Sequence, residues 1–270
     1  VTVTGVNDDI DDGNQGYNAV LAAVTSSDPV YDTLNPADVS VTNIDDETAG
    51  FTISAISGPT IEDGTQATFT VKLTSEPTNN VTIGVSSSNT DEGTVSTASL
   101  VFTAVNWNAN QTVTVTGIDD DIVDGNQGYN IVLAAATSSD TVYNGLDPAD
   151  VSATNNDQGE TAGFTIGSIS GNTMEDGTQA TFTVKLTSEP TANVTIGVTS
   201  SNTNEGTVSP ASLVFTSVNW DANQTVTVTG VNDDIDDGNQ GYNIILAAAT
   251  SSDPVYDTLN PSDVSATNTD

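Results

Sequence analysis

Hydrophobic and polar residues alternate along most of this chain, with Val, Ile, Leu and Phe separated by single Thr, Ser or Asn residues. A period of two residues is typical of a β-strand with one buried and one exposed face, and Val and Thr favour that conformation. Gly, Asn, Asp and Pro fill the segments between the alternating runs, where they favour turns. Within residues 47–157 the pattern predicts seven strands, at about 50–56, 66–74, 80–88, 98–103, 110–118, 127–137 and 150–155.

The alternating pattern recurs along the chain. The string VTVTG begins at residues 1, 113 and 226, and AGFTI begins at 49 and again at 162. This period predicts the C-terminal part of one repeat at 1–46 and complete repeats at 47–157 and 158–270. Seven short strands in a repeat of this size predict an all-β fold, a tandem array of seven-stranded antiparallel β-sandwiches of the immunoglobulin-like type.

Residues 1–46 supply only the last strands of such a sandwich. Alone they would leave strand edges and an apolar face exposed. We therefore expect either a preceding segment or another chain to complete this sandwich. The chain also starts without Met and inside an alternating run, as expected for part of a longer protein, so the missing targeting signal carries no weight.

Charge excludes several classes of partner. The 270 residues include 37 Asp and Glu but only 2 Lys and Arg, for a formal net charge of −35. Nucleic acids and anionic membrane surfaces require clustered Lys and Arg, so neither is an expected partner, and no apolar run approaches the ~20 residues that cross a bilayer. The absence of Cys and His removes disulfides, the usual general base and most transition-metal sites. Self-repulsion of this size opposes folding unless cations offset it.

The acidic residues follow particular strands. If each strand reverses the direction of the one before it, the first, third, fifth and seventh strands end at the same pole, and oxygen-bearing side chains follow each of them. Carboxylates held together without a cation repel, and Ca²⁺ is the ion that best fits many hard oxygen ligands. The sequence therefore predicts a Ca²⁺ site at this pole of each complete repeat. Its candidate ligands are Glu62, Asp91, Glu92, Asp119, Asp120, Asp124, Asn155 and Asp157 in the second repeat, and Glu175, Glu205, Asp233, Asp234, Asp237 and Asp270 in the third.

Two other interpretations of these acids stay open. They could simply form good turns on a solvated surface, and paired acids could indicate a glycosidase. Equivalent acids in the same four loops of both repeats favour a metal instead. The loop around Gly125 does not match an EF-hand, because Ile122 stands where the third loop position requires an oxygen ligand and no Glu closes the loop.

Three motifs in this order resemble those of the Calx-β family. They are EDGTQATFTVKL at 62–73, VTVTGIDDDIVDG at 113–125, and the closing TNND at 154–157 or TNTD at 267–270. The resemblance implies a Greek-key β-sandwich that binds Ca²⁺ at one apex. It places the family's first-loop Glu on Glu62 and Glu175, its acidic third loop on Asp91, Glu92 and Glu205, and its fifth-strand run on Asp119, Asp120 and Asp124 or on Asn232, Asp233 and Asp237.

The chain departs from the family in its closing motif. The family's three closing Asp are reduced here to Asn155-Asn156-Asp157 and Asn268-Thr269-Asp270. Fewer charged ligands imply one or two weakly bound ions at each pole, suited to millimolar extracellular calcium.

Near-identical tandem repeats without Cys favour an exported, non-enzymatic structural protein, such as a stalk, an adhesin spacer, or a subunit of a surface filament or sheath. Calcium at each acidic pole would stiffen the adjoining linkers, 44–49 and 156–162. Expected partners are neighbouring repeats or other copies of the protein, and by extension a cell surface or polysaccharide.

Three other functions are alternatives. The family also occurs in exchangers, so a Ca²⁺-sensing module of a larger protein is an alternative. Trp107 and Trp220 could stack on sugars in a carbohydrate-binding module, although anchors that close the sandwich are the more common role of such residues. A Ser nucleophile lacks any His or Arg to support it, which disfavours an enzyme.

Overall fold

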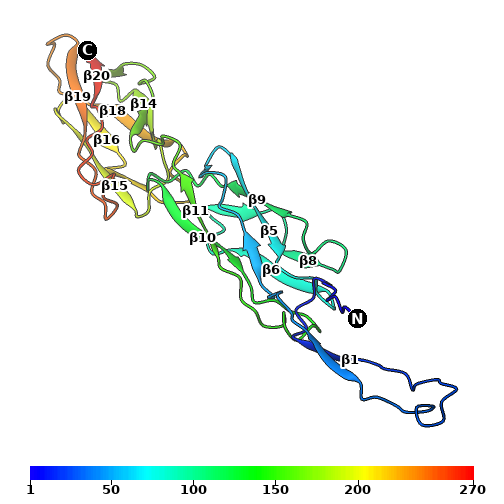
Figure 1. The fold of residues 1–270 in the computed structure, drawn as a ribbon. Helices are drawn as coiled ribbons and strands as arrows, with labels where there is room; N and C mark the ends of the chain where they lie inside the picture. The colour runs from blue at the N-terminus through cyan, green and yellow to red at the C-terminus, as the bar shows by residue number, and fades with distance from the viewer. The chain divides into compact units, whose positions relative to one another are not determined.

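The computed structural model describes residues 1–270 and contains strands, turns and loops but no helix, and thus no helix that could span a membrane (Figure 1). The chain forms two compact units. The first comprises Val1–Ile118 and Gly128–Asn155, and the second comprises Asp119–Gln127 and Asn156–Asp270. Each unit contains one two-sheet β-sandwich, which confirms the predicted all-β fold class.

The sandwich of the first unit has a four-stranded sheet in the order β3-β5-β9-β7 and a five-stranded sheet in the order β4-β11-β10-β6-β8. Neighbours such as β5 and β9 pair antiparallel. The strands are β3 (Phe51–Ile53), β4 (Thr60–Ile61), β5 (Gln66–Leu73), β6 (Val81–Ser87), β7 (Gly93–Val95), β8 (Ser99–Phe102), β9 (Gln111–Gly117), β10 (Gln127–Leu133) and β11 (Val151–Asn156).

The second unit repeats this arrangement, with sheets in the orders β12-β14-β18-β16 and β13-β20-β19-β15-β17. The short strand β13 pairs parallel with β20, whereas β14 and β18 pair antiparallel. The strands are β12 (Phe164–Ile166), β13 (Thr173–Met174), β14 (Gln179–Leu186), β15 (Val194–Ser200), β16 (Gly206–Ser209), β17 (Ser212–Phe215), β18 (Gln224–Gly230), β19 (Gln240–Leu246) and β20 (Val264–Thr269).

The alternation seen in the sequence builds the core of each sandwich. In β14 the side chains of Phe182, Val184 and Leu186 are buried, while the Thr residues between them lie nearer the solvent. They pack against inward-facing residues of the other sheet, such as Ile196 on β15 and Ile244 on β19. Burial of each large apolar side chain contributes about 1.5–3 kcal/mol, so the core accounts for much of the stability.

Each sandwich has two more strands than the sequence predicts. The expected first strand is β3 followed by the separate β4, and the expected fourth strand is preceded by β7. In both places the chain leaves one sheet and enters the other, between Ser57 and Thr60 and between Val95 and Ser99. Strands of two or three residues are too short for alternation to identify, because their pairing depends on distant residues.

Residues 1–46 form the two-stranded sheet of β1 (Gln15–Ala19) and β2 (Val39–Asn43). Tyr17 pairs with Val41 in the same register that joins Tyr242 to Ala266 in the third repeat. Tyr17 is 42% exposed whereas Tyr242 is 5% exposed. This hairpin thus presents to solvent the side chains that form the core of a complete repeat.

The loop after β19 closes one end of the third-repeat sandwich, the end opposite Glu175 and Glu205. The Tyr256 hydroxyl donates to the Ser188 carbonyl (2.9 Å) and accepts from the Ser188 N–H (3.1 Å). The buried Asp253 carboxylate accepts from the N–H groups of Thr191 (2.8 Å) and Val255 (3.0 Å). Some acids of this chain therefore cap backbone groups, a role that their composition alone did not reveal. Trp220 packs against the core, in agreement with the packing interpretation.

Candidate metal centre

Acids from separate loops meet in the third repeat. Glu205 lies in the turn between β15 and β16, and Asp233 and Asp237 lie in the loop after β18. One carboxylate oxygen from each of the three lies within 4.8 Å of the others. Glu205 is only 5% exposed, so one of the three carboxylates is largely removed from water. We call this group the third-repeat acid cluster.

A buried hydrogen-bond network holds Glu205 in this cluster. The Asn268 side-chain amide donates to Glu205 Oε2 (3.3 Å) and to the Val231 carbonyl (3.0 Å). Its Oδ1 atom accepts from the Thr173 hydroxyl (3.1 Å), which is also bonded to Tyr242 Oη (3.0 Å). Asn268 is 1% exposed. The side chain therefore links the last strand to the carboxylate above it.

The same network recurs in the first unit. Asn155 donates to Glu92 Oε2 (3.4 Å) and to the Ile118 carbonyl (2.9 Å), and its Oδ1 accepts from Thr60 (3.0 Å). Asn155 is a predicted metal ligand, and these bonds show that its side chain also positions Glu92. The signal for this role was available, because Val151, Ala153 and Asn155 occupy the same inward phase of one alternating strand.

The loop after β18 is shaped by its own side chains. The Asp233 carboxylate accepts from the Ile235 N–H (3.1 Å), and Asp270 Oδ2 accepts from the Gly238 N–H (3.0 Å). Asp270 thus ties the end of the last strand to this loop. Asp234 has a left-handed backbone with φ of 59° and an exposed side chain that belongs to no carboxylate group, and Asp91 of the second repeat is likewise exposed and outside any group.

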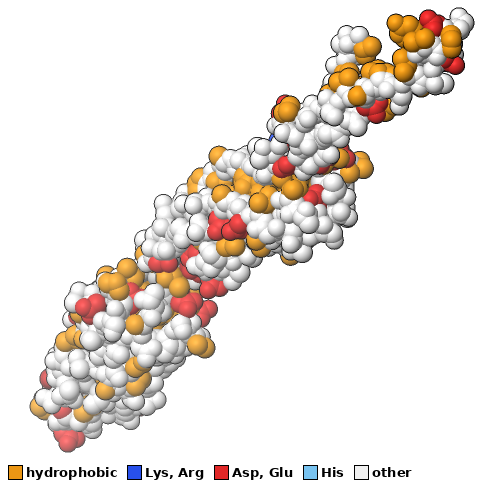
Figure 2. Space-filling model, turned by 60° about the horizontal axis from the view of Figure 1, so that its bottom comes forward, with side chains coloured by type: hydrophobic (Ala, Val, Ile, Leu, Met, Phe, Trp, Pro, Cys, Tyr) orange, Lys and Arg blue, Asp and Glu red, His pale blue; other side chains and the backbone are white.

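The electrostatics of the third-repeat acid cluster favour a cation. Burial, followed by the charges of Asp270, Asp233, Asp237 and Glu205, raises the pKa of Glu175 above its ordinary value. The only two lysines of the chain lie on β5 and β14, and the face drawn in Figure 2 shows groups of Asp and Glu with almost no Lys or Arg. The Glu175 carboxylate is therefore repelled by four other predicted ligands, Asp270, Asp233, Asp237 and Glu205.

The predicted ligands of the second repeat are divided between the two compact units. Glu62 and Glu92 are buried in the first unit, at 4% and 5% exposure, and Asp119, Asp120, Asp124 and Asp157 belong to the second. Burial raises the pKa of Asp120, and the charges of Asp124, Asp119 and Asp121 add to the shift, against a hydrogen bond from the Ile122 N–H. Asp157 Oδ2 accepts from the Gly125 N–H (2.9 Å), as Asp270 does from Gly238.

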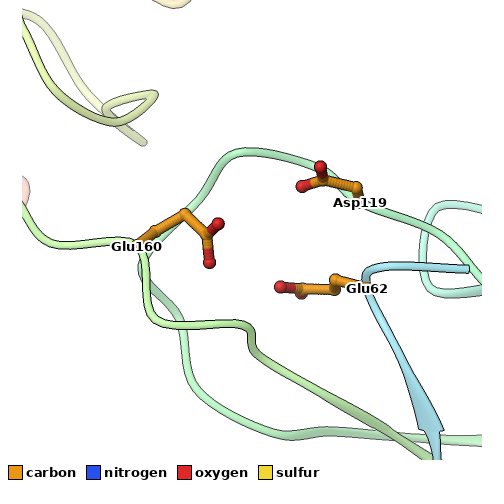
Figure 3. A group of neighbouring side chains, drawn as sticks. All are labelled: Glu62, Asp119 and Glu160. Atoms are coloured by element: carbon orange, nitrogen blue, oxygen red, sulfur yellow. The ribbon is translucent and has the colours of Figure 1, made fainter. Parts of the chain in front are cut away.

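Glu160, in the linker after β11, is an acid that sequence reasoning missed. Figure 3 shows Glu160 with Asp119, another acid of the second unit. Its Oε2 atom is buried without a hydrogen-bond partner. The pKa of Glu160 is raised: its own N–H favours the charged form, but burial, a hydrogen bond with Asp157 and the charges of Asp157 and Asp119 outweigh it. No strand end marks this position, so strand-based reasoning could not find it.

These shifts predict how stability depends on pH without calcium. The pKa values of Glu175, Glu160 and Glu189 are higher in the folded than in the unfolded chain. At a pH between the unfolded and the folded pKa, the folded state therefore binds more protons than the unfolded state. We expect the melting temperature in EDTA to rise as the pH falls from 7 toward about 5. Below the model-compound value of 3.8 it should fall, because hydrogen bonds from Thr178 hold the pKa of Asp176 low. Thermal unfolding at constant ionic strength tests this, and a melting temperature that falls between pH 7 and 5 would contradict it.

No family model and no curated protein matches this chain. Several solved structures do. The calcium binding domain CBD12 of CALX1.1 is 11% identical with a TM-score of 0.35, covering 79% of this chain and 96% of that one. Domains 5–6 of the S-layer protein SbsC are 16% identical with a TM-score of 0.25, covering 83% and 99%. The E. coli chaperone DraB is 8% identical with a TM-score of 0.29, covering 81% and 98%. At such values the assignment of the fold rests on the sheets of this chain itself.

Proposed function

We propose that each complete repeat binds Ca²⁺ at its acidic pole, and that the chain is a non-enzymatic structural segment of an extracellular protein: a stalk, an adhesin spacer, or a subunit of a surface filament or sheath. The observation that carries this proposal is the third-repeat acid cluster. It places three carboxylates within 4.8 Å of one another, one of them buried, where no lysine offsets their charge.

The donor set suits calcium. All the side chains offered at the cluster are carboxylates, and Ca²⁺ accepts 6–8 oxygen ligands in flexible geometry. Glu205, Asp233 and Asp237 would hold the ion. Glu175 and Asp270 would add negative charge near it. Zinc would favour Cys or His, and the chain contains neither. When bound, the ion would neutralise the repulsion and cross-link loops that follow different strands.

Calcium would also act on the linkers. Asp157 and Glu160 lie in the segment that follows β11, and they interact with each other while Asp119 adds its charge. A cation here would offset the charge carried by the linker itself. We therefore propose that calcium converts a repelling, loosely held linker into a stiff one, so that the array functions as a rod.

The proposal predicts a calcium-dependent stability. At a free Ca²⁺ concentration a hundred times its dissociation constant, binding to the folded state alone should stabilise the chain by about 2.7 kcal/mol relative to EDTA. Thermal unfolding of residues 1–270 at fixed ionic strength measures this. Asp233→Asn should remove the contribution of the third repeat, because it takes one ligand from the cluster.

Asp221→Asn provides the matched control. Asp221 is exposed, lies in the loop between β17 and β18, and belongs to no carboxylate group, so its replacement removes the same charge away from the cluster. The calcium effect should persist in this variant. If NaCl stabilised the chain as well as CaCl₂, or if both variants responded alike, the acids would be a solvated surface and the proposal would fail.

A further inference from the structure

A loop of one repeat contacts a turn of the next at two places in the chain. The Asp9 carbonyl accepts a hydrogen bond from the Glu76 N–H (2.7 Å), and the Asp121 carbonyl accepts one from the Glu189 N–H (2.8 Å). Ile122 and Glu189 also form an isolated parallel bridge. The second contact is extensive enough that Asp119–Gln127 belongs to the compact unit of the sandwich it touches.

Only one backbone N–H of the turn is not used within its own repeat. Glu76 and Glu189 are the central residues of the only two Ser-Glu-Pro strings in the chain. The Ser188 N–H is already bonded to Tyr256 Oη, as Ser75 is to Tyr143 Oη, and the following Pro has no N–H. The Glu N–H is therefore the backbone donor of this turn that can bond to a carbonyl group of another repeat.

The loop is shaped for the contact by its own residues. Asp9 and Asp121 have left-handed φ angles of 63° and 58°, which L-residues other than Asn and Asp seldom adopt. A carboxylate on one side of each of these residues accepts a hydrogen bond from the N–H on the other side. Asp8 accepts from the Ile10 N–H (3.2 Å), and Asp120 accepts from the Ile122 N–H (3.0 Å). These features set the direction of the carbonyl group that meets the turn.

The third copy of the loop has the same shape and no such partner. Residues 230–243 are identical in sequence to residues 5–18. Asp234 has φ of 59°, and Asp233 accepts from the Ile235 N–H (3.1 Å). Ile235 is 57% exposed, whereas Ile10 and Ile122 are half-buried in the docked copies. Both Ser-Glu-Pro turns of the chain are already engaged by the other two loops.

We propose that the loop of residues 230–240 is a preformed docking site for the Ser-Glu-Pro turn of a further repeat of this type, joined after Asp270. The Asp234 carbonyl would accept from the central Glu N–H of that turn, and Ile235 would become half-buried against it. This deepens the proposed role as a repeat array and rests on it. It does not require calcium, because the two observed contacts are backbone hydrogen bonds.

The test extends residues 1–270 at the C-terminus with a second copy of residues 158–270 and measures amide hydrogen exchange. The added Glu N–H should be protected to a similar degree as that of Glu189, in EDTA as well as in Ca²⁺. Core amides of the added copy, such as that equivalent to Val226, show whether it is folded. A folded added copy whose Glu N–H exchanges like a solvent-exposed amide would overturn the proposal.

Two variants of the extended chain separate backbone shape from charge. Asp234→Gly and Asp234→Val remove the same carboxylate, but Gly adopts a left-handed φ readily and Val does not. Protection of the added Glu N–H should fall about tenfold in the Val variant and change little in the Gly variant. Equal protection in the two would overturn the docking geometry. If calcium did not stabilise the extended chain although the added Glu N–H was protected, only the proposed calcium site would be contradicted.

Discussion

Replacement of Gly230 by Ala is expected to destabilise the third repeat by about 3 kcal/mol. A Cβ atom at this position would clash with the Met174 carbonyl oxygen and would lie 2.6 Å from Asn268 Oδ1. Neither can move freely, because β13 pairs with β20 and the Asn268 side chain is bonded on both sides. Urea unfolding followed by Trp220 fluorescence, in a Trp107→Phe background, measures the change.

Gly241→Ala is the matched control for this prediction. Gly241 lies on β19 of the same repeat, and a Cβ atom there meets nothing within 4 Å. Its replacement should leave the free energy of unfolding within about 0.5 kcal/mol. If the two alanine variants unfolded at the same urea concentration, the close approach of β13 to β18 would not be a constraint on the fold.

Asn268→Leu is expected to destabilise the third repeat by about 3 kcal/mol. Leu has a similar size but leaves Glu205, Thr173 and the Val231 carbonyl without the bonds that Asn268 makes. Because those groups are buried or half-buried, water does not readily replace Asn268. The stabilisation by calcium should also decrease, since Glu205 would no longer be held beside Asp233 and Asp237. Urea unfolding in EDTA and in Ca²⁺ measures both effects.

Asn243→Leu makes the same chemical change at an exposed position. Asn243 Oδ1 accepts only from the Ser265 hydroxyl (3.1 Å) across the surface of β19 and β20. We expect an effect below about 0.5 kcal/mol and an unaltered response to calcium. An Asn268→Leu variant as stable as Asn243→Leu would show that the network under the acids does not hold the pole together.

Local pattern was enough to predict the faces of the long strands. Residues such as Phe182 and Val184 of β14 alternate with Thr, and the period of two assigns each side chain to one face without knowledge of its partner. The repeats were visible for the same reason, because identical strings return at a constant spacing. The location of acids after alternate strands depended only on strand direction, and in the third repeat Glu205, Asp233 and Asp237 do meet.

Other features depend on contacts between distant residues, and only the tertiary structure decided them. The transfer of the chain between sheets at β4 and β7 is set by partners far along the sequence. The role of Asn155 follows from bonds to Thr60 and Glu92. The position of Glu160 near Asp157 and Asp119 follows from the folded path of the linker after β11. The sequence by itself determined which residues face inward and which loops carry charge, because both are local properties. Packing decided which of those residues form the acid clusters and which hold them in place, because packing brings together groups that are far apart along the chain.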